Sequence, residues 1–259
     1  MTEHYSSSSR NLPPEHEKEI QINVGFAEKT SPRLEKEGKP SQDYLLVDKQ
    51  NGIFGVFDGA GGGGGRPDIA SQAAAEASHQ TLLEAGDPST YADLKTSLRY
   101  AYMNARLRVL EQAEGGITVG TLVRITKING KPTLGIAHAG DTRLFWASEL
   151  DGSRLQELTT EQISPNPMEG NVITNYLGSQ TERHQGEDDE YKIFNIPEAG
   201  GRLMMCSDGI TGDGYVDDSL TSEEVADAWN QSDPQDAADK FLEYSRKVDD
   251  KTVLVLDIK

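Results

Sequence analysis

Alternation of apolar and polar positions predicts β-strands along much of this chain. Every second residue from Ile20 to Phe26 is apolar, which is the period of a half-buried strand. The dipeptide Asn51-Gly52 lies between two apolar runs, and Asn-Gly in that setting is the strongest short-range signal of a β-hairpin. Strands are predicted at residues 44–47, 53–57, 121–128, 133–139, 144–147, 202–206 and 252–256.

Four longer stretches between these strands are predicted to be helices. Pro67 opens a helix that runs to about residue 84, and Thr90 begins a second that runs to about residue 112. Thr221 with Glu224 forms a capping pair for a third helix, and Pro234 lies in the first turn of a fourth. A further short helix is predicted at 171–177, whereas residues 30–41 are interpreted as a charged loop.

The order of these elements decides the fold class. Strands are followed by two helices, more strands, two more helices and a last strand, without the regular alternation of a parallel sheet. We therefore predict an α+β protein in which antiparallel sheets carry helices on their outer faces. The 259 residues suit one large domain or two small ones. Residues 1–19 are polar and Ser-rich and are predicted to be a disordered tail, and residues 20–259 the folded domain.

Charge and cysteine content exclude several classes of protein. The 25 basic and 43 acidic residues give a net charge of −18, which disfavours binding to nucleic acid or to an anionic membrane. No apolar run approaches the roughly 20 residues of a membrane span, and the polar, Ser-rich start does not resemble a signal peptide. The single cysteine, Cys206, excludes an internal disulfide framework and a Cys-rich zinc site. We expect a cytoplasmic protein.

Several familiar catalytic motifs are absent from the sequence. Five glycines at 61–65 are followed by Arg66-Pro67 and not by the Lys and Ser/Thr of a nucleotide-binding P-loop. No arginine follows Cys206 closely enough to clamp a phosphate, as a cysteine-based phosphatase requires. We expect Cys206 and His138 to be core residues, and the glycine run to allow close approach of the backbone.

Aspartates at the ends of apolar strands are the remaining chemical signal. A single such residue is usually a structural turn residue. Several of them converging on one place would repel one another and raise each other's pKa, and divalent cations would keep them ionised. Oxygen-only ligands select hard ions such as Mg²⁺ or Mn²⁺. The residues in question are Asp58, Asp141, Asp208, Asp249 and Asp250.

These motifs resemble those of the metal-dependent protein Ser/Thr phosphatases, the PPM or type 2C family, and most closely its bacterial branch. The matching segments, in family order, are residues 41–43, 56–62, 120–121, 138–143, 171–174 with 177–178, 206–211 and 249–253. The resemblance implies a four-layer αββα sandwich of two antiparallel sheets flanked by helix pairs. It also implies hydrolysis of phosphoserine or phosphothreonine with two Mn²⁺ or Mg²⁺ ions and, as an open question, a third.

The resemblance assigns roles to particular residues. Asp58 would bridge the two metals, and the Gly59 carbonyl would bind one of them. Asp208 and Asp249 would complete the protein ligands of the second metal. Asp43 would orient metal-bound water, so that the expected catalytic residues are Asp43, Asp58 and Asp208. A metal-bridging water or hydroxide would be the nucleophile.

Departures from the family pattern raise further expectations. Ala60 cannot protonate a leaving group, and Gln42 replaces a glutamate of many relatives. Gly212 occupies the usual position of a third-metal aspartate, which leaves Asp141 and Asp213 as candidate ligands. Arg33 and Lys39 are the candidates for binding substrate phosphate. The short segment between residues 162 and 171 predicts an open site.

Three functional hypotheses follow from these residues. The first is a phosphoprotein phosphatase that opposes a Ser/Thr kinase, and the acidic surface predicts a preference for phosphosites flanked by Lys or Arg. The second is a weakly active or inactive module that binds a phosphoprotein, motivated by Ala60, Gln42 and Gly212. The third is a regulatory phosphatase acting on an anti-sigma-type pathway protein.

Overall fold

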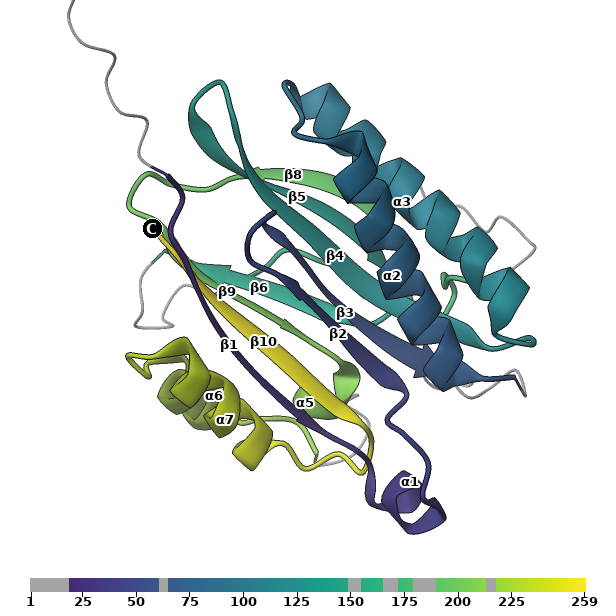
Figure 1. Cartoon of the computed structure of the whole chain (residues 1–259). Helices are drawn as coiled ribbons and strands as arrows, with labels where there is room; N and C mark the ends of the chain where they lie inside the picture. The colour runs from purple at the N-terminus through teal and green to yellow at the C-terminus, as the bar shows by residue number, and fades with distance from the viewer. Residues whose placement is uncertain (1–18, 61–64, 149–154, 165–171, 179–189, 213–217) are drawn as a thin grey trace, which may run out of the picture.

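A computed structural model describes residues 19–60, 65–148, 155–164, 172–178, 190–212 and 218–259. Within these ranges the chain forms two five-stranded antiparallel sheets packed face to face, with a pair of helices on each outer face (Figure 1). The predicted α+β, four-layer αββα architecture is therefore confirmed. The described helices include none that is long and apolar enough to cross a membrane.

The first sheet joins the two ends of the described chain. Its strand order is β1 (Ile22–Lys29), β10 (Lys251–Ile258), β9 (Gly201–Cys206), β6 (Arg143–Ala147) and β7 (Gln156–Glu157). The helices α6 (Ser222–Trp229) and α7 (Pro234–Tyr244) cover its outer face, where Trp229 and Phe241 pack on Val253 and Val255. The predicted capping box of Thr221 and Glu224 is present at the start of α6.

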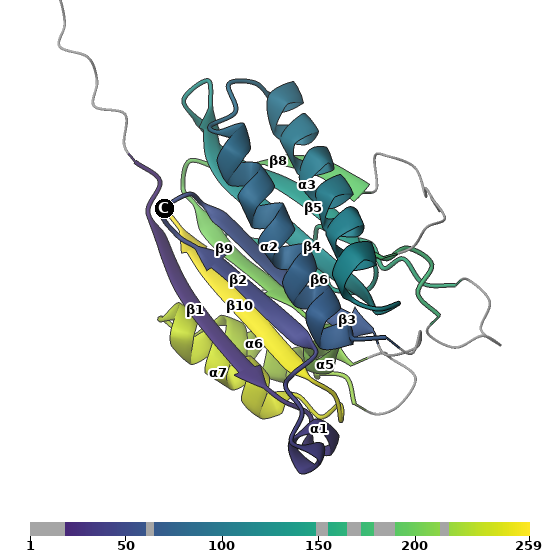
Figure 2. The ribbon, with the colours of Figure 1, turned by 45° about the vertical axis from the view of Figure 1, so that its right-hand side comes forward.

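The second sheet carries the longer helices. Its order is β2 (Asp43–Asp48), β3 (Ile53–Ala60), β4 (Ile117–Ile128), β5 (Lys131–Ala139) and β8 (Tyr191–Asn195). The helices α2 (Pro67–Ala85) and α3 (Tyr91–Gln112) lie side by side over this sheet (Figure 2). Buried alanines on α2, including Ala70 and Ala74, let that helix approach the strands closely.

Strand β3 shows how the layers are filled. Phe54 and Val56 face the first sheet in the central core, whereas Ile53 and Phe57 face the helices α2 and α3. Successive side chains point to opposite faces of a strand, and both faces of β3 are buried. Residues 53–57 are therefore an almost continuous apolar run, and Asp58 follows that run within β3, at the edge of the core.

The structure corrects two local predictions. The expected loop at 30–41 contains a short helix, α1 (Pro32–Glu37), because Pro32 favours the first helical turn and Leu34 is buried beneath it. The helix predicted at 171–177 is wrong for the described residues 172–178, which make isolated β-bridges from Ile173 to Ile163 and from Leu177 to Thr118. The tail was predicted at residues 1–19. Residues 1–18 lie outside the described residues, and Glu19 is the first residue that the structure describes.

Candidate active site

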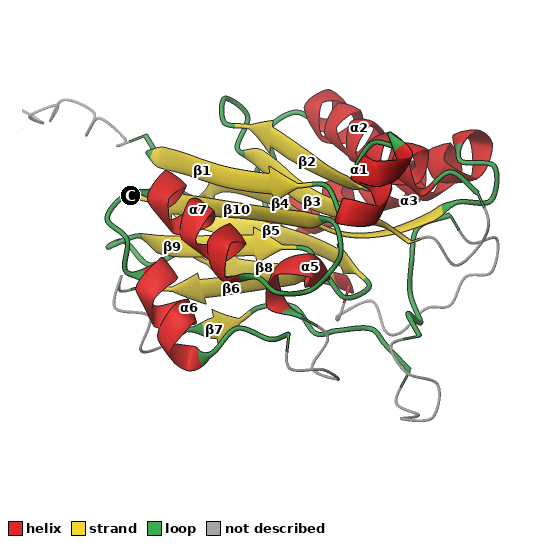
Figure 3. Ribbon diagram, turned by 90° about the horizontal axis from the view of Figure 1, so that it is seen from below, coloured by secondary structure: helices red, strands yellow, loops and turns green. Residues whose placement is uncertain are grey.

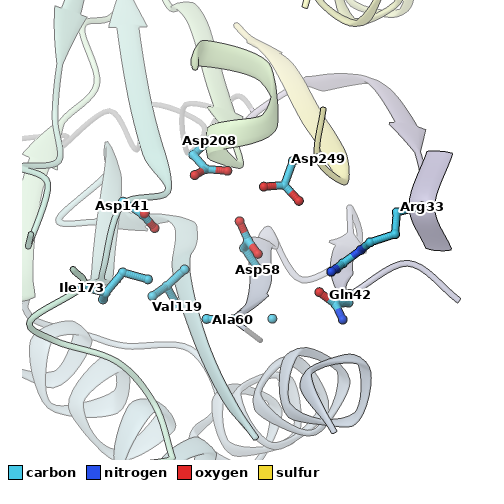
Figure 4. Close-up of a pocket in the computed structure, with 10 residues that line it drawn as sticks. Arg33, Gln42, Asp58, Ala60, Val119, Asp141, Ile173, Asp208 and Asp249 are labelled. Atoms are coloured by element: carbon cyan, nitrogen blue, oxygen red, sulfur yellow. The ribbon is translucent and has the colours of Figure 1, made fainter. Parts of the chain in front are cut away.

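Strand ends from both sheets meet around one cavity of about 240 Å³. Asp43 and Asp58 are cross-strand partners on β2 and β3. Asp208 follows β9 and begins the short helix α5 (Asp208–Thr211), and Asp249 precedes β10. Figure 3 shows α1 and α5 at the same end of the sheets. The cavity is lined by Arg33, Gln42, Asp58, Gly59, Ala60, Val119, Asp141, Ile173, Asp208 and Asp249 (Figure 4).

Four carboxylates approach one another in this cavity. Asp58 lies at its centre, with Asp208 and Asp249 on one side and Asp141 on another (Figure 4). Burial raises the pKa of Asp58 well above its ordinary value, and the charges of Asp43, Asp208, Asp141 and Asp249 raise it further. Burial, together with the charge of Asp208, raises the pKa of Asp141 to about 7. The arrangement accumulates negative charge where a cation would be stabilised.

Asp43 is buried beside this cluster but does not line the cavity. The Ser207 hydroxyl donates a 2.8 Å hydrogen bond to Asp43 Oδ2, and the Thr252 amide donates to the Ser207 hydroxyl at 3.1 Å. The other oxygen, Asp43 Oδ1, has no hydrogen-bond partner among the described residues. Burial raises the pKa of Asp43 to about 7, and the nearby charges of Asp250 and Asp208 add to the effect.

A second buried aspartate, Asp250, holds the backbone of the site. Its carboxylate accepts 2.6 Å hydrogen bonds from the amides of Ser31 and Gln42. The Gln42 carbonyl in turn accepts a 3.0 Å hydrogen bond from the amide of Gly59. A Cβ at Gly59 would lie 2.3 Å from the Pro67 carbonyl oxygen, so only glycine fits there. Asp250 thereby connects the start of β10 to the backbone on which Asp58 is carried.

A lysine side chain contacts two of these carboxylates. Lys247 forms an ion pair with Asp208, and its Nζ is 3.5 Å from Asp249 Oδ2. Burial by itself lowers the pKa of Lys247, but the charges of Asp208, Asp249 and Asp58 outweigh that effect and raise it above its ordinary value. Sequence reasoning missed Lys247, although its position two residues before Asp249 was a usable signal.

The ligand chemistry of the cavity fits a hard divalent ion. Asp58, Asp208 and Asp249 offer only oxygen donors, which suit Mg²⁺ or Mn²⁺. The unpartnered, buried Asp43 oxygen and the mutual repulsion of the carboxylates also favour a positive charge. In the described part of the chain, however, no three acidic, His or Cys side chains are arranged to hold one ion in this conformation. The ion pairs of Lys247 with Asp208 and Asp249 explain this, because the lysine holds these carboxylates in positions that do not form a ligand set.

The two candidates for phosphate binding have different positions. Arg33 lines the cavity, and its guanidinium points towards Gln42 (Figure 4). Lys39 does not line it; its side chain is 63% exposed and pairs with Glu37 at 2.7 Å. Asp213, a candidate ligand of a third ion, lies outside the described residues. The structure therefore brings Arg33 and Asp141 to the cavity and leaves Lys39 outside it.

His138 and Cys206 are core residues, as predicted. His138 hydrogen-bonds to Thr121 Oγ1 at 3.0 Å and to the Thr160 carbonyl at 3.1 Å, and burial lowers its pKa to about 4. Cys206 packs under α6 and α7, and burial raises the pKa of its thiol to about 12. Gly65 would place a Cβ 1.9 Å from the Gly116 amide nitrogen, so the backbone approaches closely there, against the connection between α3 and β4; the rest of the glycine run, 61–64, lies outside the described residues.

Comparison with solved structures defines the class of fold. No family model matches this sequence, and no curated protein is similar to it. The structure is nevertheless similar to a set of solved phosphatases that includes bacterial proteins. Its fold is that of the PPM Ser/Thr phosphatases, which confirms the resemblance predicted from the motifs at the level of the fold.

Three of these structures illustrate the likeness. The PPM Ser-Thr phosphatase MsPP from Mycobacterium smegmatis, in complex with cacodylate, has a TM-score of 0.68 at 22% identity over 91% of this chain and 97% of its own. The catalytic domain of PstP, in complex with two manganese ions, has a TM-score of 0.68 at 18% identity over 93% and 99%. PppA, a regulatory component of the type VI secretion system in Pseudomonas aeruginosa, has a TM-score of 0.66 at 20% identity over 92% and 98%.

Proposed function

We propose that this chain is a Mn²⁺- or Mg²⁺-dependent phosphoprotein phosphatase that hydrolyses phosphoserine and phosphothreonine. The observation that carries the proposal is the convergence of Asp58, Asp208, Asp249 and Asp141 on one cavity that also contains Arg33. The shared fold supports the proposal, since PstP has that fold and was solved with two manganese ions.

The proposed metal ligands are those that the resemblance to the phosphatase motifs implies, and all of them line the cavity. Asp58 and the Gly59 carbonyl would hold one ion, and Asp58 with Asp208 and Asp249 would hold a second. Asp141 is the described candidate for a third ion. When bound, such ions supply Lewis-acid stabilisation of the phosphate and lower the pKa of water. Carboxylates that repel one another in the free protein would then become an ionised ligand set.

Arg33 in the cavity and Asp43 buried beside it are the residues proposed to position substrate and water. Arg33 offers a planar, permanently charged guanidinium that can bind two phosphate oxygens together. Asp43, fixed by Ser207, presents an unpartnered carboxylate oxygen that can accept a hydrogen from water. Ala60 has no proton to donate, so a leaving serine or threonine alkoxide takes its proton from water.

A phosphoprotein-binding module with little turnover is the second candidate function. The ion pair between Lys247 and the proposed ligand Asp208 favours it, because it places a charged side chain where the proposed reaction needs a metal. Such a module would bind phosphopeptides through Arg33 without releasing phosphate.

Release of inorganic phosphate from synthetic peptides tests the proposal. Phosphoserine and phosphothreonine peptides with basic or acidic flanks are incubated with Mn²⁺ or with EDTA, and a phosphotyrosine peptide serves as the control. We expect metal-dependent release from the first two, faster with basic flanks because the chain carries a net charge of −18. Tight peptide binding by folded, Mn²⁺-treated protein without phosphate release would instead support the binding module.

A further inference from the structure

Lys247 is held among acidic groups by the chain on both sides of it. It lies between α7 and β10, in a segment whose Arg246 pairs with Glu224 of α6 and donates a 3.2 Å hydrogen bond to the Ser219 carbonyl. On the other side, Lys251 donates a 2.8 Å hydrogen bond to the Ser245 carbonyl. The backbone on either side of Lys247 is therefore fixed.

The side chain of Lys247 points into the site. It is only 16% exposed, whereas its neighbour Val248 is 78% exposed. Its ammonium contacts Asp208 and Asp249, two carboxylates proposed as ligands of the same ion. An ammonium group and a divalent ion cannot both occupy the space between these carboxylates, because each requires direct contact with the same oxygens.

We propose that Lys247 is a tethered competitor of the metal ion at the Asp208–Asp249 side of the cavity, and that it must leave these carboxylates before the ion binds. The proposal rests on the proposed function, since it concerns the same site. Among the described residues, Lys247 makes no ion pair with Asp58 or Gly59, which form the other metal position, so its effect there is limited to the longer-range charge interaction with Asp58.

A regulatory consequence follows from this competition. The free energy of the lysine ion pairs is subtracted mainly from metal binding at the position that includes Asp208 and Asp249. That position binds the ion more weakly than it would without the lysine, and its occupancy follows the free metal concentration over the range in which the lysine is displaced. The flexible four-carbon stem of lysine allows the displacement without movement of the backbone.

Calorimetric titration of the full chain with Mn²⁺ tests this proposal directly. The variants are Lys247→Met and, as a matched control, Lys240→Met. Lys240 lies on α7 and pairs with the exposed Glu243, so its removal changes the net charge equally without touching the site. We expect Lys247→Met to bind one Mn²⁺ ion about tenfold more tightly than the wild type or better, and Lys240→Met to stay within about twofold of the wild type.

Thermal unfolding in EDTA measures the effect of Lys247 on the stability of the metal-free protein. Lys247→Met should unfold at a lower temperature than Lys240→Met, because its carboxylates are left without a counter-charge, and Mn²⁺ should raise its unfolding temperature more. Lys247→Gln, which can still donate a hydrogen bond to Asp208, replaces it if the methionine variant does not fold. Equal Mn²⁺ affinities in all variants would overturn this inference alone. Absence of Mn²⁺ binding in every variant, including the wild type, would overturn the proposed function with it.

Discussion

The hydroxyl of Ser207 and the carboxylate of Asp43 connect the two sheets at the site. Ser207 follows β9 in the first sheet and Asp43 begins β2 in the second, and a 2.8 Å hydrogen bond joins them in the core. The same hydroxyl accepts a hydrogen bond from the Thr252 amide of β10. Asp43 is therefore positioned by three strands, two of which belong to the opposite sheet.

Replacing this hydroxyl should destabilise the protein. Ser207→Ala leaves both oxygens of a buried carboxyl group without a described partner, which costs about 1–3 kcal/mol of unfolding free energy. Ser97→Ala is the control, because the partner of the buried Ser97 hydroxyl among the described residues is the carbonyl of Leu94 in its own helix. Urea unfolding of both variants makes the comparison, and an equal loss in the two would contradict the proposed connection.

Gly59 should not tolerate a side chain. In Gly59→Ala the new methyl would lie 2.3 Å from the Pro67 carbonyl oxygen, so backbone must move, at a cost of about 2 kcal/mol or more. Gly38→Ala is a control with a left-handed φ of +64° and open space around it, and should lose only about 1 kcal/mol. Denaturation curves showing Gly59→Ala to be the milder change would disprove this interpretation.

Arg33→Ala and Lys39→Ala should have different effects on the steady-state kinetics of hydrolysis of a small phosphate ester. Arg33→Ala removes the cation that lines the cavity and should raise KM about tenfold or more. Lys39→Ala removes an exposed charge outside the cavity and should leave both kcat and KM unchanged. A larger effect from Lys39→Ala would reassign the phosphate-binding role.

His138 should make the stability of the protein depend on pH. Its folded-state pKa of about 4 lies below the ordinary 6.5, so the unfolded chain binds more protons between these values. Its contribution to stability is complete above about pH 6.5 and is lost as the pH falls towards 4, by at most about 1.4 kcal/mol per pH unit. His138→Gln lacks this contribution, so urea unfolding should show its difference from the wild type shrinking below pH 6.5. A constant difference between pH 4 and 7 would refute the prediction.

Local sequence patterns predict most of the fold because strong signals coincide. The turn Asn51-Gly52, the cap of Thr90 with Asp93 and the buried run of β10 each agree with the tertiary structure. The edge strand β8 was missed, since its pattern is short and half-buried. The helix predicted at 171–177 is wrong for the described residues because a local pattern does not reveal β-bridges, one of which joins Leu177 to the distant Thr118.

Part of the candidate site could also be predicted from the sequence, and part could not. Strand-end aspartates can be found in the sequence, and Asp58, Asp208 and Asp249 meet as expected. The contacts of Ser207 and Asp250 could not be predicted, because each joins elements whose spacing is set by the packing of the two sheets. Lys247 had one local signal, its position two residues before Asp249, but its ion pair with Asp208 depends on the same packing.

Hydrolysis of p-nitrophenyl phosphate by the wild type and Asp58→Asn, with Mn²⁺ or with EDTA, tests the central claim most directly. Asp58→Asn removes one charge from a repelling cluster and should stay folded. Asp239→Asn is the matched control, since Asp239 lies on α7 and accepts a hydrogen bond from Gln235. We predict hydrolysis that requires Mn²⁺, persists in Asp239→Asn and falls at least about a hundredfold in Asp58→Asn. Hydrolysis that survives EDTA or the loss of Asp58, or none at all by folded, Mn²⁺-treated wild type, would contradict a metal-dependent phosphatase.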